Sequence, residues 1–412
     1  MGTAGLFEHR RSADRGSFFL RLPSGQFPVC VRTVYLDYNA TTPLDPAVRE
    51  AMLPYLGEIF GNPSSVHHIG RRARALLDDA RERMATLWGC KPSEVVFTSG
   101  GTESSNLAVL GTARYLKQRG RHLVTSQMEH HAVLHACEYL AKREGFEVTY
   151  LPVTTEGFVT VDSLLAALRP DTILVSLMAA NNESGSVQAI AELGKTCRER
   201  GIVFHTDAVQ WFGKLTFASI HQFNADLVSV CAHKFHGPKG TGALFIRAPL
   251  HPDPIALGGG HENERRAGTE NLAGIVGFSA AFAAFVPTPV FDESLLKPLR
   301  TRLLSVLDDL SSLGVSIRSP KASVLPNTVA FTVKGSDSLT LLAALDLEGI
   351  CGSAGSACSS GSLEPSHVMR AMGVPDGESN ALVRLSLGRE NTFEDVEHVA
   401  RTLPGIIERS LL

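Results

Sequence analysis

Apolar and polar residues alternate along the chain in two periods, and this pattern predicts an α/β fold. From Asp45 onward, short runs rich in β-branched residues are separated by longer stretches with apolar residues at helical spacing. Such alternation is typical of a mainly parallel sheet wrapped by helices. The runs that we interpret as strands are 94–98, 122–126, 172–178, 201–207 and 226–230, with 242–247 as a further candidate.

Two helices are predicted early in this region, and a second domain is predicted late in the chain. Asp45 and Pro46 form an N-cap and a first-turn proline that open a predicted helix over 45–60, and a second helix is expected over 71–88. After the Pro-Thr-Pro at 287–289, three shorter strands with helices around them predict a smaller α/β domain. Residues 1–33 show little apolar periodicity, so we expect a disordered N-terminal extension.

Composition narrows the classes of function. The chain has 412 residues, 44% of them hydrophobic, and a formal net charge of -3 from 39 basic and 42 acidic side chains. This balance gives no electrostatic case for binding nucleic acid or anionic lipid, so we expect small molecules or proteins as partners. No apolar run approaches the roughly 20 residues needed to cross a bilayer, and we expect a cytoplasmic protein without membrane contact.

The cysteines are few and scattered, and no two of them form a CxxC pair. In a long chain this argues for reduced thiols, and against a disulfide framework or a structural zinc site. We therefore expect no metal and judge each cysteine separately. The seven are Cys30, Cys90, Cys137, Cys197, Cys231, Cys351 and Cys358.

A glycine-bearing turn follows the first predicted strand, where ligands of open α/β sheets gather. Residues 99–102, Ser-Gly-Gly-Thr, precede a helix that we expect to run from about Glu103. Free N-H groups and the helix dipole at such a place suit a phosphate, although a Gly-Gly turn before a helix is more often only a turn. The turn matches neither the P-loop nor the dinucleotide fingerprint, which disfavours ATP and NAD.

Three further strand ends carry candidate chemistry. His130 and His131 are adjacent at a predicted helix start and point in different directions, so a shared metal ion is disfavoured; ring stacking or acid-base work by one of them competes with plain surface positions. Asp207 ends a strand, where helix capping is the commoner role. Lys234 follows an apolar strand, and partial desolvation there would lower its pKa and make it a nucleophilic amine.

Together these residues say more than each one singly. An anion site, an aromatic face, a carboxylate for a pyridinium nitrogen and an amine for a Schiff base are the parts that hold pyridoxal 5'-phosphate. The sequence therefore predicts an enzyme that uses this cofactor.

At this point the sequence resembles the cysteine desulfurases of the nitrogen-fixation type, within the class V aminotransferase family. The resemblance covers most of the chain, from residue 35 to residue 390, and leaves only about the first 34 residues outside. The motifs that carry it are YLDYNATTP, FGNPSSVH, FTSGGTES, MEHHAVL, ANNESGSVQ, HTDAVQ, CAHKFHGPKG, RRAGTEN, GSACSSGSLEPSHVMRAMG and LVRLSLGRE.

The resemblance implies an aspartate-aminotransferase-like homodimer of fold type I. A large cofactor-binding domain would span 48–286, and a small α/β domain built from 34–47 and 287–412 would carry the loop of the catalytic cysteine. Lys234 would bind the cofactor covalently, Asp207 would pair with its pyridinium, and His130 would stack on its ring. The other implied contacts are Asn182 and Gln210 beside the ring oxygen, Gly101, Thr102, Cys231 and His233 around the phosphate, Thr269 at the phosphate of the other subunit's cofactor, and Arg384, Asn39 and Asn182 at the substrate.

Cys358 is the implied nucleophile. It stands on a segment that contains Gly352, Gly355 and Gly361, and we expect this loop to let the thiol visit two places. The resemblance implies that Cys358 takes the sulfur of L-cysteine as a persulfide, leaves L-alanine, and delivers the sulfur to an acceptor such as an iron-sulfur scaffold. His130 and the freed Lys234 are the implied proton carriers.

Two alternatives remain open from the sequence. A selenocysteine lyase or another class V aminotransferase-like enzyme would keep the cofactor and change the reaction. A sulfur-carrier or assembly module would have no enzymatic activity, and Cys358 would then be an ordinary exposed loop thiol.

Overall fold

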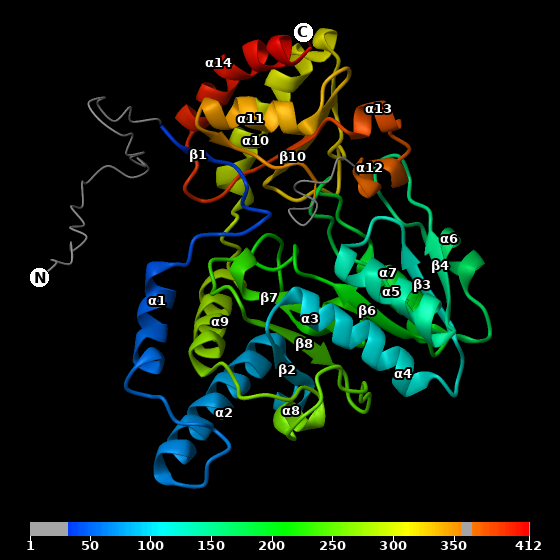
Figure 1. Ribbon diagram of the computed structural model, residues 1–412, viewed down its shortest axis with the longest axis vertical. Coiled ribbons are helices and arrows are strands. Elements are labelled where there is room, and N and C mark those ends of the chain that lie inside the picture. Colours follow the sequence, from blue (N-terminus) through cyan, green and yellow to red (C-terminus); the bar gives the residue numbers. More distant parts are fainter. Residues whose placement is uncertain (1–31, 356–364, 412) are drawn as a thin grey trace, which may run out of the picture.

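Seven strands form the central sheet of the computed structural model, which describes residues 32–355 and 365–411 (Figure 1). The strand order is β2-β8-β7-β6-β5-β3-β4; only β8 runs antiparallel to its neighbours, so the predicted mainly parallel mixed sheet is confirmed. The strands are β2 (Val95–Thr98), β3 (His122–Ser126), β4 (Glu147–Leu151), β5 (Thr172–Ser176), β6 (Val203–Asp207), β7 (Leu227–Cys231) and β8 (Gly242–Ile246).

Helices cover both faces of this sheet and bury two apolar cores. One core lies between the sheet and α1, α2, α6, α7 and α9, and the other lies between the sheet and the π-helical turn Leu107–Gly111, α4 and α5. The helices are α1 (Pro46–Met52), α2 (His68–Trp88), α3 (Gly101–Asn106), α4 (Thr112–Leu116), α5 (His131–Glu144), α6 (Val161–Ala167), α7 (Ile190–Glu199), α8 (His261–Glu264) and α9 (Leu272–Phe285).

Strand side chains alternate between these two cores, as the pleat requires. In β7, Leu227 joins the core beneath α3 to α5, whereas Val228 and Val230 join the core beneath α2 and α9. Cys137 of α5 and Cys197 of α7 are fully buried, one in each of these cores. The odd and even positions of each strand therefore have separate environments.

A second, smaller group of elements lies above the large sheet in Figure 1. Its antiparallel sheet has the order β12-β10-β9, and β1 pairs in parallel with β11 beside it, so the start of the described chain joins the core of the late segment. The domain limits themselves stay a prediction. The elements are β1 (Val34–Tyr35), β9 (Val315–Ile317), β10 (Thr328–Val333), β11 (Ile350–Cys351), β12 (Leu382–Ser386), α10 (Glu293–Asp309), α11 (Ser338–Leu347), α12 (His367–Ala371), α13 (Asp376–Ser379) and α14 (Phe393–Ser410).

A methionine-rich cluster joins the two groups of elements. Met128 and Met178 of the large group pack with Met369, Met372 and smaller apolar residues of the small group. Unbranched thioether side chains adapt to irregular gaps, so this contact can keep its packing through small shifts. Within residues 32–355 and 365–411, no helix is both long and apolar enough to span a membrane.

The structure departs from the sequence prediction at three places. The helix predicted over 45–60 begins at Asp45 as an N-cap, but α1 ends at Met52 because Pro54 has no N-H for a further helical bond, and a short 3-10 turn follows. Helix α3 begins at Gly101, two residues earlier than expected. The edge strand β4 was not predicted, because its sequence EVTYL is only partly buried and lacks a long apolar run.

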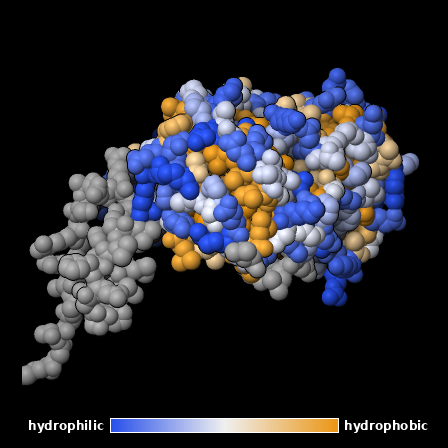
Figure 2. All heavy atoms as spheres, turned by 90° about the horizontal axis from the view of Figure 1, so that it is seen from above, coloured by the Kyte–Doolittle hydropathy of each residue, from blue (hydrophilic) through white to orange (hydrophobic). Residues whose placement is uncertain are grey.

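The surface over the small group is mixed. Seen from above, hydrophilic residues surround scattered hydrophobic ones (Figure 2). Large hydrophobic side chains exposed on the elements of this group include Leu339, Leu347 and Phe393. Single exposed apolar residues of this kind are common on globular proteins.

We expect Phe282→Ala to lower the free energy of unfolding by about 3–5 kcal/mol, because the change leaves a cavity in a dense aromatic core. Phe282 is fully buried and its ring lies within 5.4–6.4 Å of those of Phe212, Trp88 and Phe278. Urea denaturation followed by circular dichroism measures the loss. Leu347→Ala, at an 83% exposed position, is the control with little effect; equal losses in the two variants would contradict this prediction.

Candidate active site

The predicted site residues gather at one edge of the large sheet. Strands β2, β3, β5, β6 and β7 are mutually parallel, so their carboxyl ends meet at this edge. Gly101, His130, Asn182, Asp207 and Lys234 each lie at or shortly after one of these ends. The predicted site residues therefore lie at the carboxyl ends of the strands, where ligands of open α/β sheets bind.

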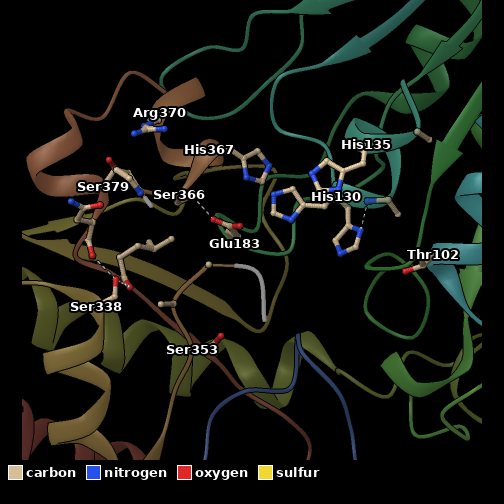
Figure 3. Close-up of a pocket in the computed structure, with 18 of the residues that line it drawn as sticks. Thr102, His130, His135, Glu183, Ser338, Ser353, Ser366, His367, Arg370 and Ser379 are labelled. Atoms are coloured by element: carbon tan, nitrogen blue, oxygen red, sulfur yellow. Dashed lines mark hydrogen bonds between the residues drawn. The ribbon is translucent and has the colours of Figure 1, made fainter. Parts of the chain in front are cut away.

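A cleft of about 1180 Å³ opens beside these strand ends, between the large and small groups of elements. Thr102 and His130 line it from the large group, and Asp37, Ser353 and Gly355 line it from segments that pair with the small group. Figure 3 shows the two walls: Thr102, His130 and His135 come from one side, and Ser338, Ser353, Ser379 and Arg370 from the other. The cleft can admit a small molecule to the strand ends.

Lys234 ends the 3-10 turn that follows β7, and among the residues that the structure describes its amine has only backbone carbonyls as hydrogen-bond partners. Its Nζ donates to the carbonyl oxygens of Asn39 at 2.7 Å and of Ala40 at 2.8 Å. Burial lowers the pKa of Lys234 to about 8, and the nearby Arg384 cation contributes, whereas Cys231, Asp37 and Asp207 oppose the shift. A substantial fraction of this amine is therefore neutral near physiological pH, in line with the lowered pKa expected from the position of Lys234 after an apolar strand.

Asp207, the last residue of β6, is almost completely buried. Burial raises the pKa of its carboxyl to about 6, and a hydrogen bond from the Val209 N-H at 3.0 Å and the charge of Lys234 oppose the rise. The carboxyl is therefore mostly ionised at neutral pH. Its bond to Val209 is a turn-capping contact, so the capping role and a ligand role coexist at this side chain.

His130 is the N-cap of α5 and is neutral. Its Nδ1 accepts the Ala132 N-H at 3.1 Å, so the ring hydrogen must lie on Nε2. Burial lowers the pKa of His130 to about 4, and the nearby Lys234 cation adds to the shift. We conclude that the free ring nitrogen of His130 is a hydrogen-bond donor at neutral pH.

The neighbouring histidines form a cluster that lines the cleft, in which the rings of His131 and His135 are stacked. The His131 ring lies 5.0 Å from that of His135 and 4.8 Å from that of His367 of α12. Among the residues that the structure describes, no group of three His, Cys, Asp or Glu side chains is placed to hold a metal ion. His131 and His130 thus have different environments, as adjacent residues at a helix start should.

The start of α3 forms a tight, anion-compatible turn. A Cβ on Gly101 would lie 2.7 Å from Cγ2 of Val209, so only glycine lets this turn approach the Asp207 segment. Burial raises the pKa of the Cys231 thiol, whereas the charge of Lys234 and the backbone N-H groups of Gly101 and His233 oppose the rise. Thr102 is exposed and lines the cleft in the first turn of α3, where the N-H groups of a helix lack intrahelical partners and favour an anion.

His233 faces the segment before α1. Its Nδ1 lies 3.1 Å from Oγ1 of Thr41, and its carbonyl oxygen accepts the N-H and the hydroxyl of Thr42. Burial lowers the pKa of His233 to about 3, so this ring is neutral as well. These contacts tie residues 41 and 42 to the turn that carries Lys234.

Arg384 on β12 is 1% exposed and already carries a carboxylate partner. Its Nη2 donates to Oδ1 of Asp37 at 2.6 Å, and its Nη1 donates to the carbonyl oxygens of Asn182 at 2.8 Å and Gly355 at 3.1 Å. Its Nε is buried without a partner among the described residues. A buried donor left unpaired is costly, so the Nε-H of Arg384 is the donor most ready to bond to a ligand oxygen.

A family model described as aminotransferase class V matches residues 34–399. The chain belongs to the class V aminotransferase family. A relative named cysteine desulfurase IscS, from Dictyoglomus turgidum, is 47% identical over 378 residues, which are 92% of this chain and 95% of the relative.

Solved structures similar to this chain have the same fold. A NifS-like protein superposes with a TM-score of 0.84 at 36% identity, covering 92% of this chain and all of the other. A structure titled SspA in complex with cysteine superposes with a TM-score of 0.76 at 34% identity, covering 87% of this chain and all of the other. The expected fold-type I architecture of this family is therefore confirmed.

The prediction from the sequence did not include two polar residues of this site, Lys214 and Asp37. Lys214 is buried, and its Nζ donates to Oδ1 of Asn39 at 2.6 Å and to Oε1 of Gln210. Burial lowers the pKa of Lys214 well below its usual value, and the charges of Lys234 and Arg384 add to the shift. The sequence feature that could have identified Lys214 is its position four residues after Gln210. Asp37 lies in the motif YLDYNATTP, from which the prediction selected only Asn39.

Asn39 and Gln210 are committed to contacts within the protein. The Asn39 amide donates to Oγ1 of Thr328 and accepts from Lys214 and from Asn327, while Gln210 Nε2 donates to the Asn39 carbonyl at 2.9 Å. A direct ligand contact by the Asn39 side chain would require one of these bonds to be exchanged. Its role as a substrate contact stays a prediction.

Two other predicted residues are not placed with this group. Thr269 is exposed on the segment between α8 and α9. Cys358 lies outside the described residues, as does Cys30. Their predicted roles are therefore untested by this geometry. Cys351 is the last residue of β11.

We expect the Lys234 amine of the cofactor-free protein to titrate with a midpoint near pH 8. The measurement is its acylation rate against pH, followed by mass spectrometry of the peptide that contains it. Arg384→Gln removes a cation and should raise this midpoint by roughly 0.5–1 unit, whereas Asp37→Asn removes an anion and should lower it by a similar amount. Shifts of the same sign in the two variants would refute the electrostatic assignment.

Proposed function

We propose that this chain is a cysteine desulfurase, which removes the sulfur of L-cysteine to give L-alanine and a persulfide on Cys358. The observation that carries the proposal is the Lys234 amine, whose pKa is lowered to about 8 and which lies with a buried carboxylate and a neutral histidine at the strand ends beside the cleft. The relative named cysteine desulfurase IscS, at 47% identity, supports the same activity.

The donor set fits pyridoxal 5'-phosphate. Lys234 supplies a reactive amine, Asp207 supplies a buried carboxylate for a pyridinium nitrogen, and the turn at Gly101 and Thr102 supplies N-H groups for a phosphate. When bound, this cofactor withdraws electrons from the substrate's α-carbon. Cys231 and His233 would flank the phosphate, and Asn182 and Gln210 would lie beside the ring oxygen.

Proton transfer is divided between two groups in this proposal. The amine of Lys234, with its pKa near 8, can take up and return a proton close to neutral pH. His130 cannot accept a proton on Nε2, because that nitrogen already carries the ring hydrogen. Its role is to present a flat neutral ring and to donate a hydrogen bond from Nε2, so Lys234 acts as the base.

Arg384 would bind the substrate carboxylate through its unpaired Nε and through Nη2. Nη2 is held by Asp37 in this structure, so a substrate carboxylate must share or replace that partner. Asp37 therefore orients the guanidinium and competes with the substrate carboxylate for Nη2 of Arg384. The structure titled SspA in complex with cysteine supports the choice of an amino-acid substrate for this fold.

Cys358 performs the sulfur transfer in this proposal. Its thiolate attacks the substrate sulfur, the C-S bond breaks, and the substrate carbon keeps the bonding electrons and takes up a proton to give alanine. The transferred sulfur remains on Cys358 as a persulfide. A sulfur acceptor such as an iron-sulfur scaffold would then take it, and a homodimer in which Thr269 reaches the other subunit's site completes the proposal.

The proposed activity predicts equal amounts of alanine and sulfide when the purified protein is given pyridoxal 5'-phosphate, L-cysteine and a thiol reductant. Cys358→Ser should abolish the persulfide, seen by mass spectrometry after alkylation, and lower alanine formation by at least about 100-fold, because the nucleophile is lost. Cys351→Ser is the matched control and should retain most of the activity. Alanine formation that is unchanged in Cys358→Ser, or activity with selenocysteine alone, would refute the proposal.

We expect Arg384→Lys to raise KM for L-cysteine by about 10- to 100-fold, because lysine lacks the Nε donor and the planar fork of arginine. Steady-state alanine formation at several cysteine concentrations measures KM and kcat separately. If kcat fell by a larger factor than KM rose, Arg384 would not act mainly by binding the substrate carboxylate. The intact cofactor absorbance of the variant serves as the control for folding.

A further inference from the structure

The carboxylate of Glu183 contacts residues on both sides of the segment that carries Cys358. Residues 356–364, which include Cys358, lie outside the described part of the chain, between Gly355 and Pro365. Glu183 belongs to the loop between β5 and α7 of the large group, is 2% exposed and lines the cleft. The contacts that it makes before and after the segment differ in kind.

The contact after the segment is a hydrogen bond. Oγ of Ser366 donates to Oε2 of Glu183 at 2.5 Å, and Figure 3 shows this bond. The same Oγ accepts the Met369 N-H at 3.2 Å as the N-cap of α12. Because a hydroxyl both donates and accepts, Ser366 caps α12 and holds Glu183 at the same time. His367 adds a second contact to the large group, since its Nε2 lies 2.9 Å from the Glu129 carbonyl oxygen.

The contact before the segment is a close approach that favours glycine. A Cβ on Gly355 would lie 3.1 Å from Oε2 of Glu183 and 3.3 Å from its Oε1, and Gly355 has a φ of +57°. Nη1 of Arg384 donates to the carbonyl oxygens of Gly355 at 3.1 Å and Asn182 at 2.8 Å. The chain before the segment is therefore held against residues 182 and 183, and the chain after it is held against residue 183.

The loop around Glu183 is held in place by a buried asparagine. Asn181 is fully buried, and its Oδ1 accepts the N-H groups of Glu183 at 2.8 Å and Ser184 at 2.9 Å. Its Nδ2 donates to the Met128 carbonyl oxygen at 3.1 Å. Side-chain hydrogen bonds of this kind fix a turn on its own backbone. Glu183 is thus a fixed point of the large group to which two separate parts of the chain attach.

We propose that Glu183 is a positioning residue for Cys358: it holds Gly355 and Ser366 at one carboxylate and so limits the space that the thiol between them can reach. Cys358 follows Gly355 by only three residues, so the position of Gly355 sets that limit. A group tethered at two fixed ends has a higher effective concentration near them than a group tethered at one. The inference rests on the proposed function for the role of Cys358, whereas the attachment of Ser366 can be measured without it.

Ser366→Asp separates the two roles of Ser366. Aspartate caps helices as well as serine does, so α12 should remain capped. An ionised carboxylate cannot donate to Glu183 and repels it, so the attachment should be lost. Adding Glu183→Gln should restore the attachment, because an amide N-H can donate to a carboxylate. Thr160→Asp places the same charge at the exposed N-cap of α6 and is the matched control.

Hydrogen exchange of the full chain, followed by mass spectrometry, measures the attachment directly. We expect exchange in the peptide that contains residues 366–372 to become about 5-fold faster in Ser366→Asp, because one hydrogen bond that opposes local opening is lost. The double variant Ser366→Asp with Glu183→Gln should return close to the unmodified rate, and Thr160→Asp should leave this rate unchanged. An unchanged rate in Ser366→Asp, or a double variant as fast as Ser366→Asp alone, would overturn the proposal.

Two substrates of the holoenzyme test the consequence for Cys358. Persulfide formation from L-cysteine should be about 10-fold slower in Ser366→Asp and should recover in the double variant, since this step needs the thiol in place. Loss of chloride from β-chloro-L-alanine needs the cofactor but no thiol, because chloride leaves with its bonding electrons, and should be unchanged in both variants.

Equal losses with the two substrates would mean that Ser366→Asp disturbs the whole site, and would count against a positioning role for Glu183. If the unmodified enzyme formed no persulfide, the proposed function would be refuted, and with it the role of Glu183 toward Cys358. The exchange rates would then still decide whether Glu183 holds Ser366. Failure of the two proposals is therefore distinguishable.

Discussion

The lowered proton affinity of the Lys234 amine is the property on which the site depends. The Lys234 amine donates to the carbonyl oxygens of Asn39 and Ala40, and within residues 32–355 and 365–411 no carboxylate forms an ion pair with it. Carbonyl partners can serve a neutral amine as well as a charged one. Burial then decides the balance and brings the pKa to about 8, where the amine can both react and exchange protons.

This arrangement requires two parts of the chain that are far apart in sequence. Asn39 belongs to the segment between β1 and α1, and its backbone oxygen accepts from Lys234 and Gln210 while its side chain accepts from Lys214 and Asn327. Lys234, Gln210 and Lys214 follow strands of the large sheet, whereas Asn327 precedes β10 of the small sheet. One asparagine therefore fixes the position of the amine relative to both groups of elements, which explains why its amide has no spare donor.

Much of the fold and part of the site could be predicted because local sequence determines them. Strand periodicity located six strands of the large sheet, including β8, which was given as a further candidate at 242–247. Positions at or after the strand ends identified Asp207 and Lys234, since a parallel sheet brings its carboxyl ends together. The edge strand β4 escaped because one of its faces is polar. Asp37 and Lys214 escaped for another reason: their roles come from contacts with residues far away in the sequence, and no local pattern distinguishes them from surface residues.

Neutral histidines keep the positive charge of the site low. Burial places the pKa values of His130, His205 and His233 at about 3 to 4, so all three rings are uncharged at neutral pH. A charged imidazolium at any of these positions would add to the repulsion that Arg384 already exerts on Lys234 and would lower the amine's pKa further. Asp37 offsets the charge of Arg384 at 2.6 Å. The rings can then provide a stacking surface and directed N-H donors, while the carboxylates and the guanidinium set the electrostatic potential at the amine.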